Sequence, residues 1–357
     1  MFFYPKNFAF GLDIGDKSIK LADVKLKKNL KGEKRLTLTA LHECNLPPGI
    51  IYKGEIKNPP AVAEAIRECT KNVSGALLST RAVVASVPES RCYFKIIRAP
   101  QKTKQNINDF IAKNIGQHFP LEKNKLYFDW QFIDAERVAI AAAPKNLIDS
   151  YTAVIEQADL IPLSMELESM AIVRALATRV DTKSQSHKIF IDLGAGHSTI
   201  IVTENNFPIL NLNIALSGEN LTRQIARTQK LSYEEAEKLK LACGFDLNKC
   251  PPKTKKIINL LISSSVKQIY TSLQYINKFL KHKPDKIYIC GGASQMTKLS
   301  TILSEKLRVK VRHANPLTNL TLDKEVKLTN TKLLQYVTVL GLAIKGTTGD
   351  IFKLNSH

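Results

Sequence analysis

The chain has 357 residues, of which 44% are hydrophobic and 24% charged, as expected for a globular protein with a large core. It contains no apolar run of about 18 residues, and residues 1–6 lack the features of a signal peptide, so we expect a cytoplasmic protein. The net charge of +20 fits lysines on solvated faces, or a site near anionic membrane. Nucleic acid is disfavoured because the basic stretches carry no aromatic stacking residues. The six cysteines lack zinc-site spacing and are expected to be reduced thiols.

The first predicted element is a β-hairpin at residues 10–20 (FGLDIGDKSIK), in which an apolar strand ends in Asp-x-Gly before a small polar turn and a second strand. The same pattern returns at residues 190–200 (FIDLGAGHSTI). Such turns leave backbone N–H groups free for phosphate oxygens, and each places one carboxylate at its mouth. Two of them facing each other would clamp a nucleotide phosphate chain with Mg²⁺, whereas either alone would be an ordinary hairpin.

Between the hairpins, residues 60–68 are predicted to form a helix, because apolar residues recur at helical spacing after a proline. Residues 82–160 repeat a rhythm of strands and helices that suits a separate subdomain, with a half-buried strand at 128–133. A polar linker follows at 181–187.

Beyond the second hairpin, residues 216–270 have a helical pattern, with a capping box at 232–235, and residues 257–280 indicate a long helix with or without an interruption. Residues 285–296 (DKIYICGGASQM) then predict a buried strand, two glycines and a helix. The glycines would let a flat ligand lie against bare backbone.

This order of elements resembles the actin-like ATPase superfamily, in which they carry phosphate 1, phosphate 2 and adenosine. Further segments resemble the type IV pilus assembly family PilM, in family order from the first hairpin to residues 340–344: 46–56 (LPPGIIYKGEI), 83–90 (VVASVPES), 96–100 (IIRAP) and 158–171 (ADLIPLSMELESMA). The resemblance implies an α/β fold of the actin-like (ribonuclease H-like) class, two-lobed, with an inserted small α+β subdomain as in FtsA and PilM.

The resemblance also implies a division of the chain. Lobe one is expected at residues 1–81, with the inserted, partner-binding subdomain at 82–160 and a lobe-one connecting helix at 161–185. Lobe two is expected at residues 186–330, and a C-terminal helix at 331–357 would return to lobe one.

On this resemblance, Asp13 and Asp192 approach Mg²⁺ through waters. Lys17 or Lys20 is a candidate to neutralise phosphate charge, although strand alternation can turn Lys20 to solvent. His197 either hydrogen-bonds a phosphate or caps its turn, and the cap is favoured. The phosphate-binding turns comprise Gly15, Asp16, Lys17 and Ser18 in turn one, and Gly194, Ala195, Gly196, His197, Ser198 and Thr199 in turn two.

The adenosine side resembles the family at three places. Residues 236–240 (AEKLK) match a ribose-contacting motif through Glu237 and Lys240, for which the alternative is an exposed ion pair. Residues 217–222 (SGENLT) match a glycine loop through Gly218, with Ser217 in place of its first glycine. The third place is the strand–Gly-Gly segment with Gly291, Gly292 and Ala293.

Glu168 resembles the glutamate that orients a hydrolytic water in the superfamily. The alternative is a carboxylate on a helix surface, and Glu166 is the second candidate for the catalytic role.

Taken as a family member, the chain would be an ATP- and Mg²⁺-binding scaffold of type IV or competence pilus assembly, with weak or absent hydrolysis. It would bind the N-terminal peptide of a PilN-like inner-membrane protein and associate peripherally with the cytoplasmic face of the inner membrane. Binding of nucleic acid is not expected, and homo-oligomerisation stays open.

Two alternatives have the same fold. One is an FtsA-like division scaffold, against which residues 347–357 look too short for an amphipathic membrane helix. The other is a small-molecule kinase, for which no equivalent of the catalytic Asp or of the sugar-binding residues was found.

Overall fold

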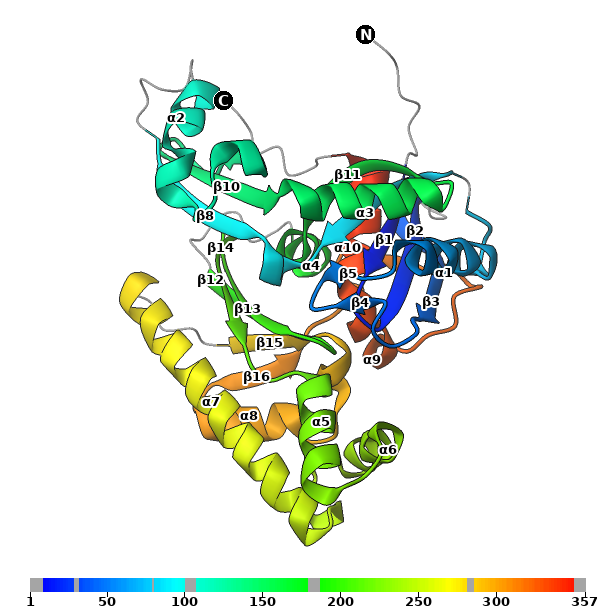
Figure 1. Ribbon diagram of the computed structural model, residues 1–357, viewed down its shortest axis with the longest axis vertical. Coiled ribbons are helices and arrows are strands. Elements are labelled where there is room, and N and C mark those ends of the chain that lie inside the picture. Colours follow the sequence, from blue (N-terminus) through cyan, green and yellow to red (C-terminus); the bar gives the residue numbers. More distant parts are fainter. Residues whose placement is uncertain are drawn as a thin grey trace. The chain divides into compact units, whose positions relative to one another are not determined.

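The computed structural model describes residues 9–28, 32–78, 80–99, 107–178, 187–280 and 286–349 (Figure 1). Residues 181–186 of the expected linker and residues 350–357 of the C-terminal tail lie outside this described part. The chain divides into two compact units, which are taken one at a time below. Lobe one contains residues 1–177, 317–327 and 338–357, and lobe two contains residues 178–316 and 328–337.

Lobe one is built on a mixed sheet in which β1 and β2 form the first predicted hairpin. Strands β2 and β3 are also antiparallel, whereas β7 and β11 continue the sheet on the other side of β1 in parallel. Its strand order is β11 (Ile161–Leu167), β7 (Ala82–Val87), β1 (Phe10–Ile14), β2 (Ser18–Lys28), β3 (Lys34–Asn45) and β17 (Thr321–Leu322), with β6 (Ser74–Gly75) also on β3.

Helix α1 (Pro59–Lys71) confirms the helix predicted at residues 60–68. It begins where the Asn58 side chain accepts a hydrogen bond from the Ala61 N–H at 3.2 Å, and prolines occupy its first turn, where no backbone donor is needed. Its apolar face shares one core with β1, β2 and α3 (Lys145–Gln157). A short hairpin, β4 (Ile51–Tyr52) and β5 (Glu55–Ile56), precedes it.

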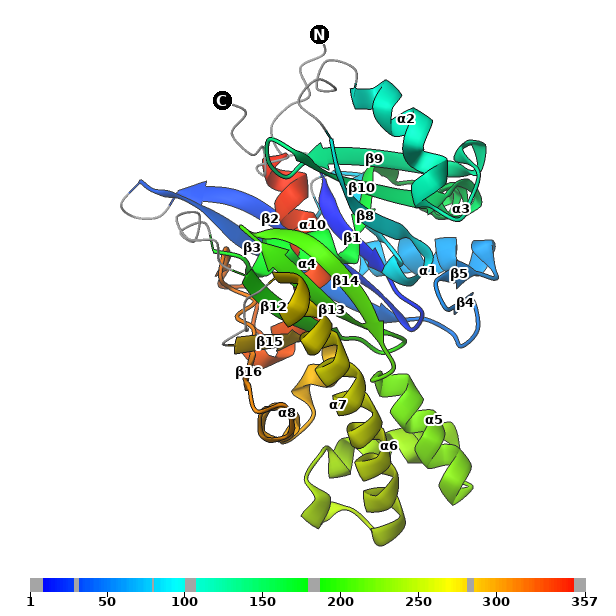
Figure 2. The same ribbon diagram turned by 90° about the vertical axis from the view of Figure 1, so that its left-hand side faces the viewer.

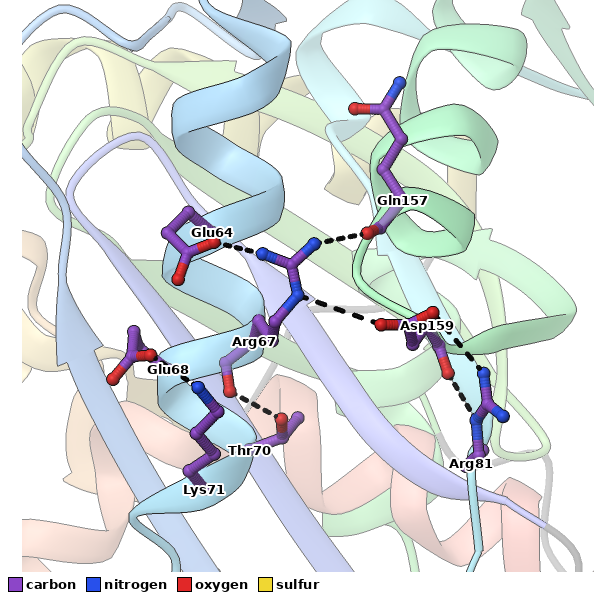
Figure 3. Close-up of polar contacts among 8 residues, drawn as sticks. All are labelled: Glu64, Arg67, Glu68, Thr70, Lys71, Arg81, Gln157 and Asp159. Carbon is purple, nitrogen blue, oxygen red and sulfur yellow. Dashed lines mark hydrogen bonds and ion pairs between the residues drawn. The ribbon is translucent and has the colours of Figure 1, made fainter.

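Polar contacts fix α1 beside the loop that follows α3 (Figure 3). The Arg67 guanidinium donates to the Gln157 carbonyl at 2.7 Å and lies 3.8 Å from the Asp159 carboxylate. Arg81 donates to the Asp159 carbonyl at 2.5 Å, and Lys71 pairs with Glu68 at 2.8 Å along the last turn of α1. Lobe one also contains the helices α4 (Glu168–Leu176) and α10 (Val337–Thr348).

A second, three-stranded antiparallel sheet lies within residues 82–160. Its order is β8 (Tyr93–Arg98), β10 (Arg137–Pro144) and β9 (Leu126–Phe132), and α2 (Ile107–His118) packs on it around Ile111 and Ile115. Figure 1 shows α2, β8 and β10 together. Residues 93–142 form the separate core of this part of the chain. Strand β7 and helix α3 do not contribute to it, because β7 belongs to the central sheet and α3 packs in the core of lobe one.

Lobe two repeats the strand pattern of lobe one. Strands β12, β13 and β14 are antiparallel, and β15 and β16 continue the sheet in parallel on the other side of β12. The order is β14 (Phe207–Ile214), β13 (Ser198–Glu204), β12 (His187–Leu193), β15 (Lys286–Cys290) and β16 (Lys310–His313).

The helices of lobe two include α5 (Gly218–Gln229), α6 (Tyr233–Cys243), α7 (Pro252–Leu280), α8 (Leu299–Leu307) and α9 (Asn330–Leu333). The predicted capping box is confirmed, because the Ser232 side chain and the Glu235 side chain each accept the other residue's backbone N–H. Helix α7 is continuous and passes beside α5 (Figure 2). The glycines after β15 lead into a 3₁₀ turn, Gly292–Gln295, before α8 begins.

Candidate nucleotide-binding site

Turn one joins β1 to β2 through a tight backbone turn. The Gly15 N–H donates to the Ser18 carbonyl at 3.0 Å, which closes the turn. Asp13 stands at the end of β1, opposite Lys20 of β2, and its Oδ1 accepts a hydrogen bond from the Ser86 hydroxyl of β7 at 2.7 Å. The strand end therefore places the Asp13 carboxylate beside the turn.

The side chains of turn one are held by neighbouring parts of lobe one. The Asp16 carboxylate accepts hydrogen bonds from the backbone N–H groups of Lys53 and Gly54, at 2.9 and 2.8 Å, and so anchors the β4–β5 hairpin. The Ser18 hydroxyl donates to Glu43 at 2.7 Å, and the same carboxylate lies 3.9 Å from Lys20 Nζ. The Asp16 and Ser18 side chains are therefore engaged within lobe one.

Turn two joins β12 to β13 in the same way. The Gly194 N–H donates to the His197 carbonyl at 3.1 Å, and a Cβ on Gly194 would lie only 2.5 Å from that oxygen, so a side chain cannot fit. The carbonyls of Gly194 and Ala195 accept the N–H groups of Gly218 and Glu219 at 3.2 and 2.8 Å. The first turn of α5 therefore fixes turn two through backbone contacts.

Ser217 replaces a family glycine without distorting this region. Its φ of −132° is ordinary extended backbone, which any residue adopts, and its hydroxyl caps α5 by accepting the Asn220 N–H at 3.2 Å. Serine at this position thus adds a helix cap at no conformational cost.

The Gly-Gly segment after β15 lies directly beside Asp192. Gly291 has a φ of +84°, and a Cβ there would lie 2.4 Å from Asp192 Oδ1, so only glycine fits. The Cys290 thiol donates to the same oxygen at 3.8 Å. Burial first, and then the Asp192 carboxylate, raise the pKa of Cys290 well above its usual value, which keeps this donor protonated.

Glu237 and Lys240 form a partly buried network rather than an exposed pair. Lys240 is 5% exposed, and its Nζ lies 2.7 Å from both Glu237 oxygens, 3.0 Å from the Thr222 hydroxyl and 3.3 Å from the Gly218 carbonyl. Thr222 also donates to Glu237. A Cβ on Gly218 would lie 3.6 to 3.9 Å from Lys240, Ala293 and Ala195. Lobe two thus brings turn two, the Gly-Gly segment and the Glu237–Lys240 pair together.

Glu168, the candidate catalytic residue, begins α4 and accepts a hydrogen bond from the backbone of Glu89. The Glu168 carboxylate accepts the Glu89 N–H at 3.1 Å, while the Glu89 carboxylate accepts the N–H and hydroxyl of Ser169 at 2.7 and 2.8 Å. Burial, reinforced by the charges of Glu89 and Glu168, raises the pKa of the nearby Cys92 thiol to about 12. Sequence reasoning gave Glu89 no role, although it lies in the VVASVPES segment.

Glu166, the second catalytic candidate, is committed to a buried ion cluster. It receives both terminal nitrogens of Arg174 and the Lys345 ammonium, which lies at 3.0 Å. Burial alone would raise the pKa of Glu166, but Arg174 and Lys345 outweigh it and lower the pKa below its usual 4.5. This carboxylate therefore has a structural role.

Comparison with known proteins decides the family. The model of the family described as type IV pilus assembly protein PilM matches residues 11–347. The chain belongs to the PilM family. A chain in a solved PilM–PilN type IV pilus biogenesis complex is similar over 96% of this chain and 99% of its own length, at 21% identity and a TM-score of 0.84.

More distant structures share the fold of this PilM-family chain. EutJ, an ethanolamine utilization protein from Carboxydothermus hydrogenoformans, is 15% identical over 96% of this chain and 90% of its own, with a TM-score of 0.52. MreB 5 of Spiroplasma citri, solved with AMPPNP, is 11% identical over 96% of each chain, with a TM-score of 0.53. The expected two-lobed actin-like fold is confirmed. Among the described helices, none has the length and apolar character needed to cross a membrane.

Proposed function

We propose that this PilM-family chain is an ATP-binding scaffold of type IV or competence pilus assembly that works at the cytoplasmic face of the inner membrane. One observation supports nucleotide binding most strongly. In lobe two, turn two, the Gly-Gly segment and the Glu237–Lys240 pair lie close together. The family match supports the pilus half. MreB 5, which shares the fold, was solved with the ATP analogue AMPPNP.

The residues present fit a nucleotide with Mg²⁺. The backbone of turn two is exposed at Ala195 and Gly196, as a phosphate requires, and the close packing of Gly291 holds the Gly-Gly segment against Asp192. Turn one and Asp13 would supply equivalent groups in lobe one. The two aspartates would hold Mg²⁺ through waters, and the ion would offset phosphate charge. Glu237, Lys240 and Ala293 would lie on the adenosine side.

Hydrolysis is proposed to be slow or absent, below a turnover of about 1 s⁻¹. Glu168 would orient the water, and its carboxylate is already fixed by the Glu89 N–H. Positioning of this kind contributes to phosphoryl transfer, but no second water-positioning residue was identified beside Glu168.

The partner is proposed to be the N-terminal tail of a PilN-like inner-membrane protein, bound by the three-stranded sheet. The similar PilM chain was solved in a complex with PilN. A cavity of about 590 Å³ lies along β9, which ends the order of that sheet, and is lined by Glu122, Lys123, Asn124, Leu126, Tyr127, Phe128 and Lys145. Tyr127 is 46% exposed, and Lys145 Nζ lies 5.3 Å from its ring. Such a cavity suits a short peptide with one apolar anchor.

The test is titration of the full chain with a labelled peptide that copies the PilN-like tail. Tyr127→Ala should weaken binding by about ten-fold, because an aromatic anchor contributes about 1–2 kcal/mol at an interface. Tyr270→Ala, which removes a 50% exposed tyrosine from α7 in lobe two, is the matched control and should bind like the wild type. Equal affinities of the two variants would contradict this placement, and no binding by the wild type would contradict the partner.

The FtsA-like alternative differs in how the chain reaches the membrane. Deletion of residues after 346 should leave membrane association intact, whereas deletion of the PilN-like tail should release the chain to the cytosol. The reverse pattern would favour a division scaffold.

A further inference from the structure

Three side chains that commonly bind metal ions meet in lobe one, on a different surface of the sheet from any residue assigned above. The ligand atoms of His42, Cys44 and Cys69 all lie within 4.8 Å of one another. We propose that these three residues form a binding site for a thiophilic d¹⁰ cation, with Zn²⁺ as the representative ion.

Strand β3 supplies two of the ligands. His42 and Cys44 are two residues apart, and alternate residues of a strand point to the same face of the sheet. That face is the one covered by α1, because Cys44 packs against the core cluster that contains Val62 and Ile66. Both β3 side chains are half-buried, so an ion can reach them from the solvent side.

Helix α1 supplies the third ligand from its last turn. Cys69 is fully buried, and its thiol donates to the Ile19 carbonyl at 3.7 Å. Ile19 is the cross-strand partner of Cys44, which places Cys69 above that strand pair. The contacts of Arg67 with Gln157 and Asp159 hold this part of α1 beside the end of α3 (Figure 3). The three ligands therefore come from elements that are already fixed.

The three ligand atoms lie slightly farther apart than they would around a bound Zn²⁺, so the site would tighten when the ion binds. Zinc bonds of about 2.0–2.3 Å in a tetrahedral arrangement put ligand atoms roughly 3.4–3.8 Å apart. Rotation of the His42 and Cys44 side chains by about 1 Å would close the gap. Among the residues that the structure describes, this group has three members, so water would take the fourth position.

The ligands of this site disfavour Mg²⁺, the cation proposed for the nucleotide site. On binding, the two thiols release two protons to solvent and the imidazole donates a lone pair, so that the complex with Zn²⁺ carries no net charge. A neutral complex suits a half-buried position. Two thiolates and an imidazole prefer Zn²⁺ or Cu⁺, whereas Mg²⁺ takes oxygen ligands. This group is not evident in the sequence, because His42 and Cys69 are 27 positions apart and do not match the short ligand spacings of zinc-binding motifs.

The experiment is a competition titration of the reduced, chelator-treated full chain with Zn²⁺ against a chromophoric chelator. The wild type should bind one equivalent tightly. Cys44→Ala and His42→Ala should each lose at least about ten-fold in affinity, because even the loss of a group that only supports a ligand costs that much. Cys92→Ala, which removes another half-buried cysteine of lobe one, is the matched control and should bind like the wild type. Substitution by Co²⁺ should give a thiolate charge-transfer band that is weaker in Cys44→Ala, which keeps one of the two thiolates.

Cys69→Ala is informative only if it remains folded, and the two β3 variants keep the proposal testable if it does not. Wild-type affinity in His42→Ala or in Cys44→Ala would overturn the proposal. So would a reduced wild type that binds no Zn²⁺.

Discussion

The backbones of turn one and turn two are closed by equivalent hydrogen bonds, from Gly15 to Ser18 and from Gly194 to His197. The two turns are anchored to the rest of their lobes in different ways. Turn one is held mainly by side chains: Asp16 binds the backbone of the β4–β5 hairpin and Ser18 binds β3, with one backbone bond from the Leu46 N–H to the Lys17 carbonyl. Turn two is held mainly by backbone groups in the first turn of α5, with one side-chain bond from the Ser198 hydroxyl to the Leu216 carbonyl. Two similar turns thus differ in the balance of side-chain and backbone contacts that hold them.

The difference continues in the strands beside each turn. Next to Asp13, the parallel strand β7 carries Ser86 one residue before its end, and the chain continues to Glu89, whose side chain caps α4. Next to Asp192, the parallel strand β15 ends in Cys290 and continues to two glycines. In lobe one the carboxylates of Asp16 and Glu89 hold backbone groups in place, whereas in lobe two the segment after β15 relies on the close packing of Gly291 against Asp192. The predictions below change one kind of anchor at a time.

The largest effect is expected at Glu166 in lobe one. Glu166→Gln keeps the side-chain volume but leaves Arg174 and Lys345 without their anion, which should cost about 3–5 kcal/mol of the free energy of unfolding. Because the folded-state pKa of Glu166 is lowered, its contribution is fully present above about pH 4.5 and is lost as pH falls through the folded value. Urea unfolding should therefore show the two proteins converging in stability at acid pH. A constant difference would contradict the ion cluster.

The next effect is expected at the glycines of lobe two. Gly291→Ala forces a side chain onto a φ of +84° and against Asp192, and should cost about 2–4 kcal/mol. Gly292→Ala is the adjacent control, because its Cβ would meet only Gln335 Cβ at 3.8 Å, so its stability should change by less than about 0.5 kcal/mol. Thermal unfolding without nucleotide separates the two. Equal stability would show that the lobe-two backbone is less constrained than we infer.

A smaller effect is expected at Asp16. Asp16→Ala removes the acceptor for the Lys53 and Gly54 N–H groups and should cost about 1–3 kcal/mol. Asp16→Asn keeps one acceptor oxygen and should recover part of that loss. Hydrogen exchange at the two amides gives the direct readout, with faster exchange expected in Asp16→Ala. Unchanged protection would mean that the Asp16 side chain does not anchor turn one.

The sequence was sufficient for the local elements: the hairpins, α1 and the capping box at Ser232 each follow from periodicity or from a short motif. It did not predict contacts between distant segments. Glu89 and Ser169 are 80 positions apart, and which of several carboxylates caps α4 depends on how β7 and β11 align. For the same reason the sequence placed Asp16 in turn one but could not predict that its carboxylate binds backbone 37 positions away.

The central claim is that this chain binds ATP with Mg²⁺, and the most direct measurement is the melting temperature of nucleotide-free protein with and without Mg²⁺ and ATP. We predict an upward shift for the wild type, because a ligand at 100 times its Kd adds about 2.7 kcal/mol to the free energy of unfolding. Asp192→Ala should remain folded and show a much smaller shift. A wild-type melting temperature that does not change at millimolar ATP would contradict the account.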